Sequence, residues 1–417
     1  MAEVLRPETD AQVREAVAWA VAEETPLEIV GSGSKRGFGR PVDAAHVLDL
    51  SGLSGITSYE PEELVLSAHA GTPMAEIEAA LSEKNQMLAF EPPDFGPLYG
   101  GEAGRGTIGG VLACNLSGPR RFAAGAARDH LLGFAAVSGR GEAFKAGGRV
   151  VKNVTGYDMS KLMAGSFGTL GVLTEVTVRV VPAPETVRTV VCLGLPVGIY
   201  QETFRAAVTA AVEPTGLAAY GGYEIEIPVV QRIRDFGGEV GAFRLEGPAE
   251  SVEVRAARLK QVLHDEFSDT FDAKFDELDQ TESESFWRGV GNAELFTTDK
   301  ARDWDLWRLS IAPTDSDHAS NVLDAFFKYE LFVDWGAGRI WFGGEPAEDA
   351  HADHVRTALG YLKSGGHATL VRAPDDVRRR VPVFHPEPEA LAALSRRIKE
   401  SFDPRGILNP GRMTGAV

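Results

Sequence analysis

The sequence predicts an α+β protein that either divides into two domains or carries an insertion in one large domain. Its 417 residues exceed the roughly 100–150 residues of the commonest single domains. Helix and strand patterns alternate over the N-terminal region, and from about residue 187 strands and charged helices dominate. Between these regions lies a glycine-rich stretch without a sustained period, which indicates a long functional loop.

The charge balance argues against two classes of partner. The chain has 42 Lys and Arg against 60 Asp and Glu, a formal net charge of −18 at pH 7. Such a field repels the phosphates of nucleic acids and anionic lipid headgroups, so we expect no nucleic-acid partner. No apolar run approaches the ~18 residues of a membrane span, and the N-terminus lacks a secretion signal. We therefore expect no direct membrane insertion and a cytoplasmic location.

The cysteine count limits the redox chemistry. Cys114 and Cys192 are the two cysteines of the chain. They cannot supply the four thiolates of an iron–sulfur cluster or a disulfide framework. If electrons pass through this chain, an organic cofactor must carry them.

The N-terminal elements follow from capping residues and apolar spacing. Thr9 and Gln12 form a capping-box pattern that predicts a helix from about residue 10. Farther on, Thr72 is predicted to cap a second helix and Pro73 to open it. Apolar runs predict strands at 27–30, 46–50 and 64–68.

The rest of the chain is ordered by glycine and proline. These two residues make up more than a third of residues 91–125, and a loop of that length and composition favours wrapping of a ligand. A hairpin is predicted from Leu131 and a half-buried strand at 176–180, after which Pro182 marks a domain boundary. Later elements are predicted as helices at 253–267 and 391–402 and a strand at 304–312.

Three glycine-rich segments next to predicted strands favour an anion site, at residues 31–39, 104–110 and 165–171. Glycines let backbone N–H groups converge on a ligand such as a pyrophosphate. A dinucleotide fingerprint of the Rossmann type is excluded because Arg36 stands at its third glycine, and a Walker loop because Ser34 precedes Lys35. Any one segment alone is typical of an ordinary tight turn, but three together favour a ligand role.

A succession of motifs resembles the FAD domain of the vanillyl-alcohol-oxidase (PCMH-type) superfamily, and within it the FAD-binding E subunits of bacterial glycolate oxidases. The most specific are Gly118-Pro119-Arg120-Arg121 and Lys152-Asn153-Val154-Thr155-Gly156-Tyr157-Asp158. The resemblance covers nearly the whole chain but is faint between roughly 190 and 370. The other matching motifs are Ile29 to Lys35, Ala70 to Pro73, Phe90 to Pro93, Gly106 to Gly110, Gly168 to Glu175 and Asn409 to Arg412.

The resemblance implies an α+β fold: a two-lobed PCMH-type FAD-binding domain at 1–182, an α+β cap for substrate or subunit interaction at 183–375, and a C-terminal segment at 376–417 that returns to the flavin. It also implies FAD as cofactor, bound non-covalently because position 34 is Ser and no His lies in the first turn. The residues that it assigns to FAD are Gly31, Ser32, Gly33, Ser34, Lys35, Gly71, Thr72, Pro92, Thr107, Gly109, Gly110, Gly171, Val172 and Asn409.

The activity implied is that of an FAD-binding subunit of glycolate oxidase, which oxidises the 2-hydroxy acid glycolate to glyoxylate. Electrons would pass to partners, namely a second flavin subunit and an iron–sulfur subunit, and the complex could associate peripherally with the inner membrane. Two alternatives stay open: a non-catalytic flavin-binding structural subunit of the same complex, and a stand-alone FAD-dependent alcohol or hydroxyacid oxidase.

Catalytic residues are less clearly indicated. Oxidation of a 2-hydroxy acid needs a base for the hydroxyl proton and a cation for the carboxylate. Arg121, beside Arg120, is a candidate for the carboxylate and Tyr157 for the proton; a salt bridge and a helix start are the plainer interpretations of these residues. No metal site is expected: His351 and His354 fit a solvated helix face, and residues 364–367 lack the Glu of the metal-binding Gly-Glu-His signature of related dehydrogenases.

Overall fold

A computed structural model describes residues 3–148, 157–222, 231, 233, 238–272, 274–324 and 328–414. The chain divides into two compact units, described separately below: unit 1 holds residues 1–117, 125–183 and 386–417, and unit 2 holds 118–124 and 184–385. The predicted boundaries were 182 and 375, and residues 118–124 were assigned to the first domain. Helices and strands occur in both units, so the α+β prediction is confirmed.

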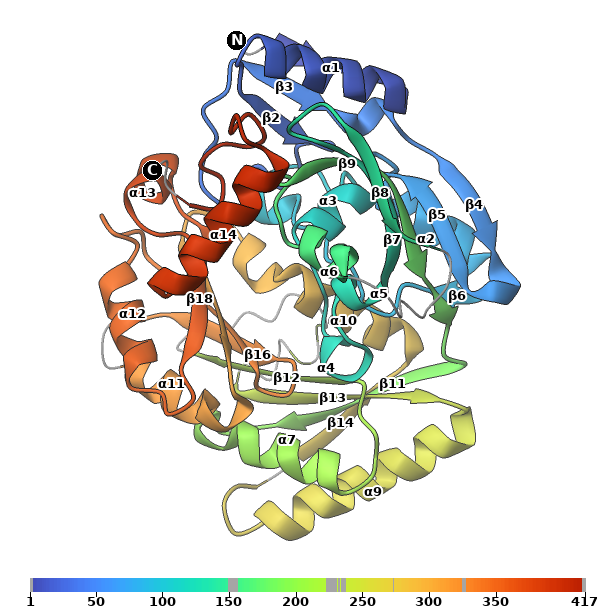
Figure 1. Cartoon of the computed structure of the whole chain (residues 1–417). Helices are drawn as coiled ribbons and strands as arrows, with labels where there is room; N and C mark the ends of the chain where they lie inside the picture. The colour runs from blue at the N-terminus through green and yellow to red at the C-terminus, as the bar shows by residue number, and fades with distance from the viewer. Residues whose placement is uncertain are drawn as a thin grey trace. The chain divides into compact units, whose positions relative to one another are not determined.

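The described residues of unit 1 form three sheets (Figure 1). A parallel sheet has the order β1-β3-β2, a five-stranded antiparallel sheet the order β4-β5-β9-β7-β8, and β10 pairs with β6. The strands are β1 Glu3–Leu5, β2 Leu27–Val30, β3 His46–Asp49, β4 Ile56–Glu60, β5 Val65–His69, β6 Gln86–Met87, β7 Leu131–Ser138, β8 Ala143–Gly147, β9 Gly171–Arg179 and β10 Val181–Pro182. The helices are α1 Asp10–Ala22, α2 Met74–Ser82, α3 Ile108–Ala113, α5 Ala127–His130, α6 Met159–Met163 and α14 Glu389–Phe402.

Local signals explain several of these elements. Thr9 caps α1 by accepting a hydrogen bond from the N–H of Gln12, as predicted. Asp158 caps α6 in the same way. The prediction for the second helix was wrong in one detail: Pro73 is the N-cap of α2, and the hydroxyl of Thr72 instead donates to the carbonyl of His69. Thr72 thus closes the turn before the helix.

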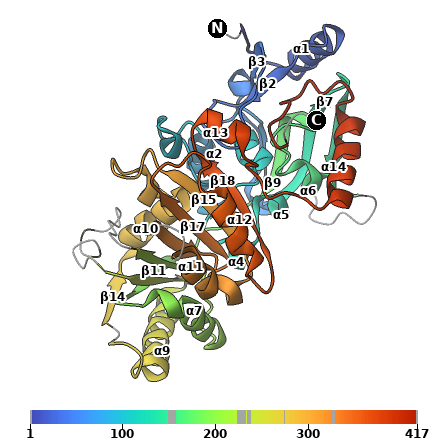
Figure 2. The same cartoon turned by 90° about the vertical axis from the view of Figure 1, so that its left-hand side faces the viewer.

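The C-terminal tail is part of the core of unit 1. Ile407 and Leu408 pack in a buried cluster with Val13 and Val17 of α1 and Leu27 of β2. The N–H of Leu27 donates to the carbonyl of Ile407, so the tail extends the edge of the parallel sheet. Helix α14, which precedes the tail, lies beside β8, where the rings of Phe402 and Phe144 are 5.8 Å apart (Figures 1 and 2). The last residues of the fold therefore complete its first strands.

The strands described in unit 2 form one antiparallel sheet of eight, in the order β14-β11-β13-β12-β16-β17-β15-β18. The strands are β11 Thr186–Leu193, β12 Gly216–Gly222, β13 Val240–Gly247, β14 Lys274–Leu278, β15 Asp305–Ile311, β16 Glu330–Asp334, β17 Arg339–Gly344 and β18 Gly366–Arg372. The helices are α4 Arg121–Ala124, α7 Tyr200–Thr209, α9 Ala249–Phe267, α10 Gln280–Asn292, α11 Ser316–Asp324, α12 Ala352–Gly360 and α13 Asp375–Arg380.

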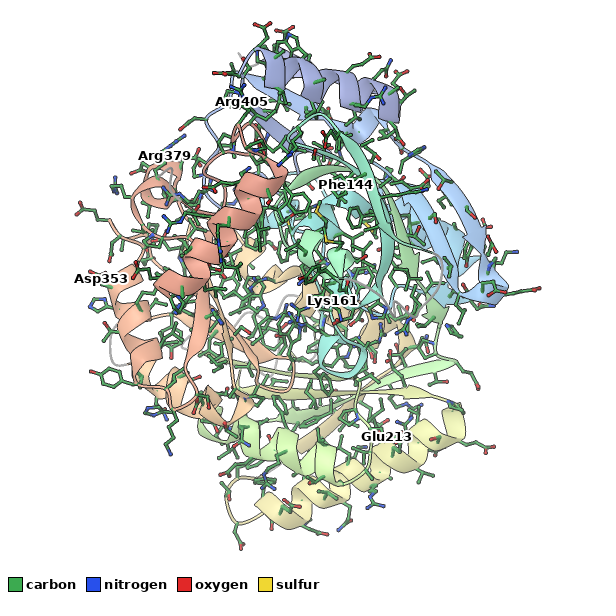
Figure 3. The ribbon with its side chains drawn as sticks, viewed as in Figure 1. Phe144, Lys161, Glu213, Asp353, Arg379 and Arg405 are labelled. Carbon is green, nitrogen blue, oxygen red and sulfur yellow. The ribbon has the colours of Figure 1, made fainter. Side chains whose placement is uncertain are left out.

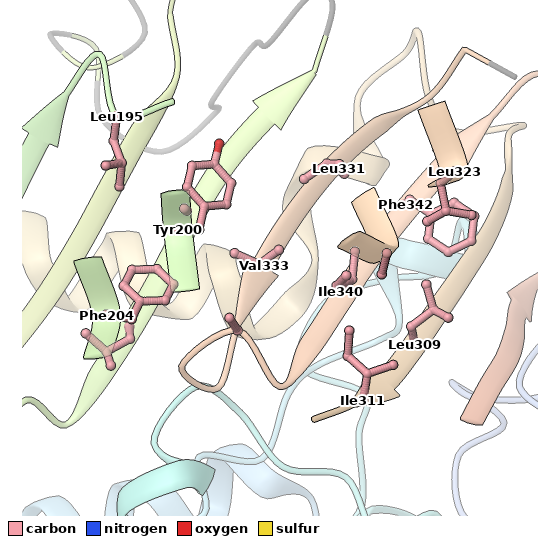
Figure 4. Packing of buried hydrophobic residues seen from close by; sticks show 14 of the residues in the cluster. Leu195, Tyr200, Phe204, Leu309, Ile311, Leu323, Leu331, Val333, Ile340 and Phe342 are labelled. Carbon is pink, nitrogen blue, oxygen red and sulfur yellow. The ribbon is translucent and has the colours of Figure 1, made fainter. Parts of the chain in front are cut away.

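The two faces of this sheet are chemically different. On one face, alternate strand residues such as Leu309, Val333 and Phe342 form an apolar core with the buried sides of α7, α9, α11 and α12 (Figure 4). The other face carries charged and aromatic side chains, among them Arg244 and Trp341. Among the described residues, no helix is long and apolar enough to cross a membrane.

Candidate functional site

A cavity lies in unit 1 where the three glycine segments meet. It encloses about 750 Å³ of empty space, including the part open to solvent, which is within the usual size of small-molecule sites. Its wall combines the turn after β2, the first turn of α3, the segment before β9 and the C-terminal tail. The lining residues are Ile29, Val30, Gly31, Ser32, Gly33, Ser34, Lys35, Arg36, Leu50, Ala70, Thr107, Gly109, Gly110, Ala113, Cys114, Ser166, Phe167, Gly168, Gly171, Leu173, Asn409 and Arg412.

The first turn is shaped by close backbone approach. A Cβ on Gly31 would lie 2.2 Å from Oγ1 of Thr107, so a side chain at position 31 would collide with the start of α3. Gly33 has a φ of +77°, in the region that glycine adopts at little cost. The hydroxyl of Ser32 donates to the carbonyl of Arg105, which ties the turn to the second glycine segment. Backbone amides can therefore approach a ligand here without a screen of side chains.

The start of α3 is held by the neighbouring chain. Thr107 caps the helix by accepting from the N–H of Gly110, and the N–H of Gly109 donates to the carbonyl of Ala70 at 2.9 Å. A Cβ on Gly109 would lie 2.7 Å from both the Cβ and the carbonyl oxygen of Ala70. Position 109 therefore requires glycine for packing as well as for access to the cavity.

The third wall comes from the segment before β9 and from the tail. Asn409 is buried, with its Oδ1 accepting from the N–H of Ile29 at 2.8 Å and its Nδ2 donating to the carbonyl of Phe167 at 2.8 Å. Asn409 has a φ of 43°, Phe167 one of 54° and Gly168 one of 70°. One amide side chain therefore joins the tail to strand β2 and to the segment before β9, and both Asn409 and Phe167 adopt the left-handed conformation that is costly for a residue other than glycine.

The electrostatics of the cavity contrast with those of the chain. Lys35, Arg36 and Arg412 line it, and the described lining contains no Asp or Glu, although acids outnumber bases in the whole chain. Arg36 forms an ion pair with Glu28. Burial lowers the pKa of Lys35, and the nearby Cys114 and Asp94 act in the opposite direction. These charges favour an anionic ligand.

Ten of the fourteen residues predicted to bind the cofactor line this cavity: Gly31, Ser32, Gly33, Ser34, Lys35, Thr107, Gly109, Gly110, Gly171 and Asn409. The other four do not. Gly71 packs against the carbonyl of Leu50, Thr72 closes a turn, Val172 lies in the apolar core of unit 1, and Pro92 is outside the lining. Their contact with a cofactor stays a prediction.

Sequence reasoning missed several lining residues. Cys114 and Arg412 lie within or beside segments that were singled out, but nothing in their spacing shows that they face one cavity. Phe167 was inside a predicted glycine segment, and its positive φ before Gly168 could not be read from the sequence. Leu50 and Ala70 are apolar residues whose place in the wall depends on the tertiary fold.

The catalytic candidates lie elsewhere. Arg120 donates to Glu246 through Nη2 at 2.5 Å and through Nε at 3.1 Å, inside unit 2. The guanidinium of Arg121 lies 4.1 Å from the ring centroid of Trp335, also in unit 2. Tyr157 is 92% exposed. The preceding residues 152–156 of its motif are outside the described part of the chain.

No cluster of three or more His, Cys, Asp or Glu that could hold a metal ion occurs within the described ranges. The rings of His351 and His354 are 6.5 Å apart, and His351 is the N-cap of α12. Cys114 and Cys192 are both free thiols. The second of these is buried in the core of unit 2, where burial raises its pKa to about 12.

Comparisons with known proteins agree with the chemistry of the cavity. Residues 1–147 match the family described as "FAD binding domain", and residues 385–413 match "FAD linked oxidases, C-terminal domain". Glycolate oxidase subunit GlcE of Escherichia coli (strain K12) is 34% identical over 96% of this chain and 95% of its own length. Glycolate oxidase subunit GlcD of Bacillus subtilis (strain 168) is 25% identical over 98% and 88%.

Solved structures show the same fold. A 4-ethylphenol oxidase from Gulosibacter chungangensis matches 99% of this chain and 89% of its own with a TM-score of 0.71 and 15% identity. A p-cresol methylhydroxylase matches 99% and 88% with a TM-score of 0.68 and 15% identity. At such low identity these likenesses concern architecture alone. They confirm the predicted PCMH-type FAD-binding fold.

Proposed function

Because the chain belongs to the family of FAD-linked oxidases that includes the Escherichia coli glycolate oxidase subunit GlcE, we propose that it is the flavin-binding subunit of an enzyme that oxidises glycolate to glyoxylate. The family makes the chain an FAD-dependent oxidoreductase subunit. FAD, when bound, supplies the acceptor for the two electrons that leave the alcohol.

The observation that carries this proposal is the wall of the cavity. Three cationic residues and a high proportion of glycines line it, no carboxylate is found among its described residues, and it lies in segments that match the FAD-binding family. In a chain of net charge −18, such a wall is unusual by composition and suits a ligand with a diphosphate. The residues present fit FAD.

The chain's own residues would act by position and charge. Gly31 and Gly33 let backbone amides approach the diphosphate, and Gly109 brings the first turn of α3 to the same ligand. Asn409 fixes the tail that closes the wall. We propose that FAD is dissociable, because Ser34 stands in the first turn and no histidine occurs there.

The electrons need a route out of the chain. Cys114 and Cys192 are too few to hold an iron–sulfur cluster, so we propose that a partner carries one, beside a second flavin subunit. The curated relatives GlcE and GlcD are both named as subunits, which supports an assembly of several chains. Such a complex could bring this chain to a membrane surface without a membrane span of its own.

A second candidate function is that of a structural subunit that binds flavin but does not turn over substrate. The engagement of Arg120 with Glu246 favours it, because this arginine is already neutralised by an internal carboxylate. In that case glycolate would be oxidised on the partner subunit, and the FAD of this chain would relay electrons or serve the assembly.

The test is an anaerobic titration with glycolate. The chain is purified with its native neighbours and then alone, and the visible spectrum is recorded before and after glycolate is added. Bleaching of the flavin in the isolated chain supports turnover on this subunit, whereas a bound but unchanged flavin supports the structural role. A folded protein that stays colourless with excess FAD would contradict both, and oxygen reduction by the isolated chain would favour a stand-alone oxidase.

A further inference from the structure

The last passage of the chain from unit 2 to unit 1 lies between His385 and Pro386. Pro386, Glu387 and Pro388 separate this point from helix α14, and the tail that lines the cavity follows that helix. We call residues 386–417 the returning segment. The last residues of unit 2 therefore fix the point from which the returning segment starts.

Arg356 of α12 fastens these last residues. Each of the two terminal nitrogens of a guanidinium carries two N–H donors. Nη1 donates to the carbonyl of Ala368 at 2.8 Å and to Nδ1 of His385 at 3.1 Å. Nη2 donates to the carbonyls of Pro382 at 3.1 Å and Phe384 at 3.2 Å. All four donors are used, and three of the four acceptors belong to the end of unit 2.

The guanidinium of Arg356 is half-buried and lies over an aromatic ring. Its central carbon is 5.2 Å from the ring centroid of Trp307. Burial lowers the pKa of Arg356 to about 10, so the group stays charged at neutral pH. No carboxylate pairs with it in the described part of the chain, and Asp353 of the same helix is exposed (Figure 3). Its charge is therefore met by three carbonyl dipoles and one imidazole lone pair.

The hydrogen bond to His385 requires a neutral imidazole. A guanidinium donates and has no acceptor, so Nδ1 of His385 must offer its lone pair. A proton on Nδ1 would remove this hydrogen bond and set an imidazolium against the guanidinium. The ring of His367 in β18 lies edge-on to that of His385, with centroids 5.1 Å apart, and a proton there would add a further cation. Burial, Arg356 and His367 all lower the pKa of His385.

We infer that Arg356 and His385 form a pH-sensitive latch, in which neutral His385 holds the end of unit 2 to α12 and protonated His385 releases it. The release is local, because Val383 is held independently. Its carbonyl accepts from the N–H of Leu370 at 2.8 Å, and its side chain is buried. Opening therefore frees residues 384–388 and ties the returning segment less closely to unit 2.

The direction of the pH effect follows from the hydrogen bond and from the lowered pKa of His385. Such a histidine stabilises the latched state above its ordinary pKa of 6.5, and the effect is lost as pH falls through the lowered value. Among the described residues, Arg356 of α12 and His367 of β18 are the charged or titratable groups that act on His385. Glu387, two positions farther on, accepts a hydrogen bond from Ser395.

Limited proteolysis of the full chain measures the latch directly. Chymotrypsin can cleave after Phe384 once residues 384–388 are released, and mass spectrometry follows this cleavage from about pH 8 to about pH 5, on both sides of the ordinary histidine pKa. Each rate is divided by that of a free peptide of residues 380–391 at the same pH. The ratio should rise roughly 10- to 100-fold in acid, the effect of losing a hydrogen bond to a charged group. Tryptophan fluorescence should stay unchanged, which shows that the fold is intact.

Two substitutions of His385 separate its charge from its shape. His385→Asn keeps an acceptor near the position of Nδ1 but takes up no proton, so its ratio should stay low at every pH. His385→Lys places a cation beside Arg356 over this whole pH range, so its ratio should be high at every pH. The control is His264→Asn, which removes an exposed imidazole of α9 in the same unit and should keep the wild-type pH profile.

A wild-type ratio that does not change with pH would overturn the inference, and so would a pH dependence that His385→Asn retains. Equal ratios for His385→Asn and His385→Lys at about pH 8 would also overturn it, because the charge at position 385 would then not control the connection. The cleavage is measured without reference to flavin, so these outcomes are distinct from those that test the proposed function.

Discussion

Replacement of Glu246 by Gln tests whether a buried charge network secures unit 2. Glu246 accepts two hydrogen bonds from Arg120, and Nε of Arg244 lies 3.8 Å from its Oε1. The guanidinium of Arg244 also lies 4.8 Å from the ring centroid of Trp287 and donates to the carbonyl of Thr215 at 2.9 Å. Glu246→Gln keeps the shape of the side chain and removes its charge.

The magnitude follows from the pKa of Glu246. Burial would raise this pKa, but the guanidinium groups of Arg244 and Arg120 outweigh burial and lower it from the ordinary 4.5 to about 2. A carboxyl whose pKa is lowered in the folded state stabilises that state above the unfolded pKa and loses the effect as pH falls through the folded pKa. At about 1.4 kcal/mol per pKa unit, the network is worth about 3 kcal/mol at neutral pH.

Urea unfolding of wild type and Glu246→Gln, followed by tryptophan fluorescence from pH 7 down to about pH 3, measures this contribution. The variant should lose about 3 kcal/mol at pH 7, and the difference should shrink steadily below about pH 4.5. Glu277→Gln is the matched control: Glu277, in β14 of the same sheet, pairs with Arg188 of β11 and Lys260 of α9, but its side chain is 29% exposed. It should lose less than about 1 kcal/mol. A loss at position 246 that does not depend on pH would refute the electrostatic account.

Three further substitutions probe the core and the cavity. Burial raises the pKa of Asp305 to about 6, which favours its protonated form in the folded state. Because the charged form is therefore costly at higher pH, Asp305→Asn should raise the free energy of unfolding by about 1–3 kcal/mol at pH 8 and leave it unchanged near pH 4. Urea unfolding of both proteins at the two pH values measures this difference. Gly109→Val should lower the FAD content and the melting temperature, because its side chain meets Ala70, whereas Gly148→Val, where a Cβ has no neighbour within 4 Å, should leave both unchanged. Asn409→Ala loses the hydrogen bonds to Ile29 and Phe167 and should therefore reduce the free energy of unfolding by about 2–3 kcal/mol. It should also speed the release of FAD, measured by stopped-flow fluorescence. A release rate equal to that of the wild-type protein would contradict a role for the tail in the cavity wall.

The sequence was most informative where local chemistry decides structure. Thr9 was identified as a helix cap because its side-chain oxygen meets an orphan N–H only three residues farther along the chain. The glycine turn at 31–34 was identified because close approach of backbone to ligand requires residues without a Cβ. Thr72 was misjudged because its hydroxyl could equally serve the helix or the turn before it, and the turn is closer.

The sequence was least informative where distant segments meet. Arg412 lines the cavity together with the turn after β2, near the other end of the sequence, and the tail is held there by long-range contacts such as the hydrogen bonds of Asn409 with Ile29 and Leu27. The resemblance predicted the return of Asn409, but no periodicity could. In the same way, no feature around residues 118–124 shows that this short segment belongs to unit 2.

That segment decides between the two arginines that the sequence offered for substrate. The chain leaves unit 1 after Ser117 and rejoins it at Gly125, and in between the carbonyl of Gly118 accepts from Nε1 of Trp335 at 2.8 Å. A carboxylate ligand could reach Arg120 only by displacing Glu246, whose pKa of about 2 shows how strongly the guanidinium groups hold it. The guanidinium of Arg121 stacks on the ring of Trp335 and is not one of the groups that lower the pKa of Glu246, so the cost of displacing Glu246 applies to Arg120.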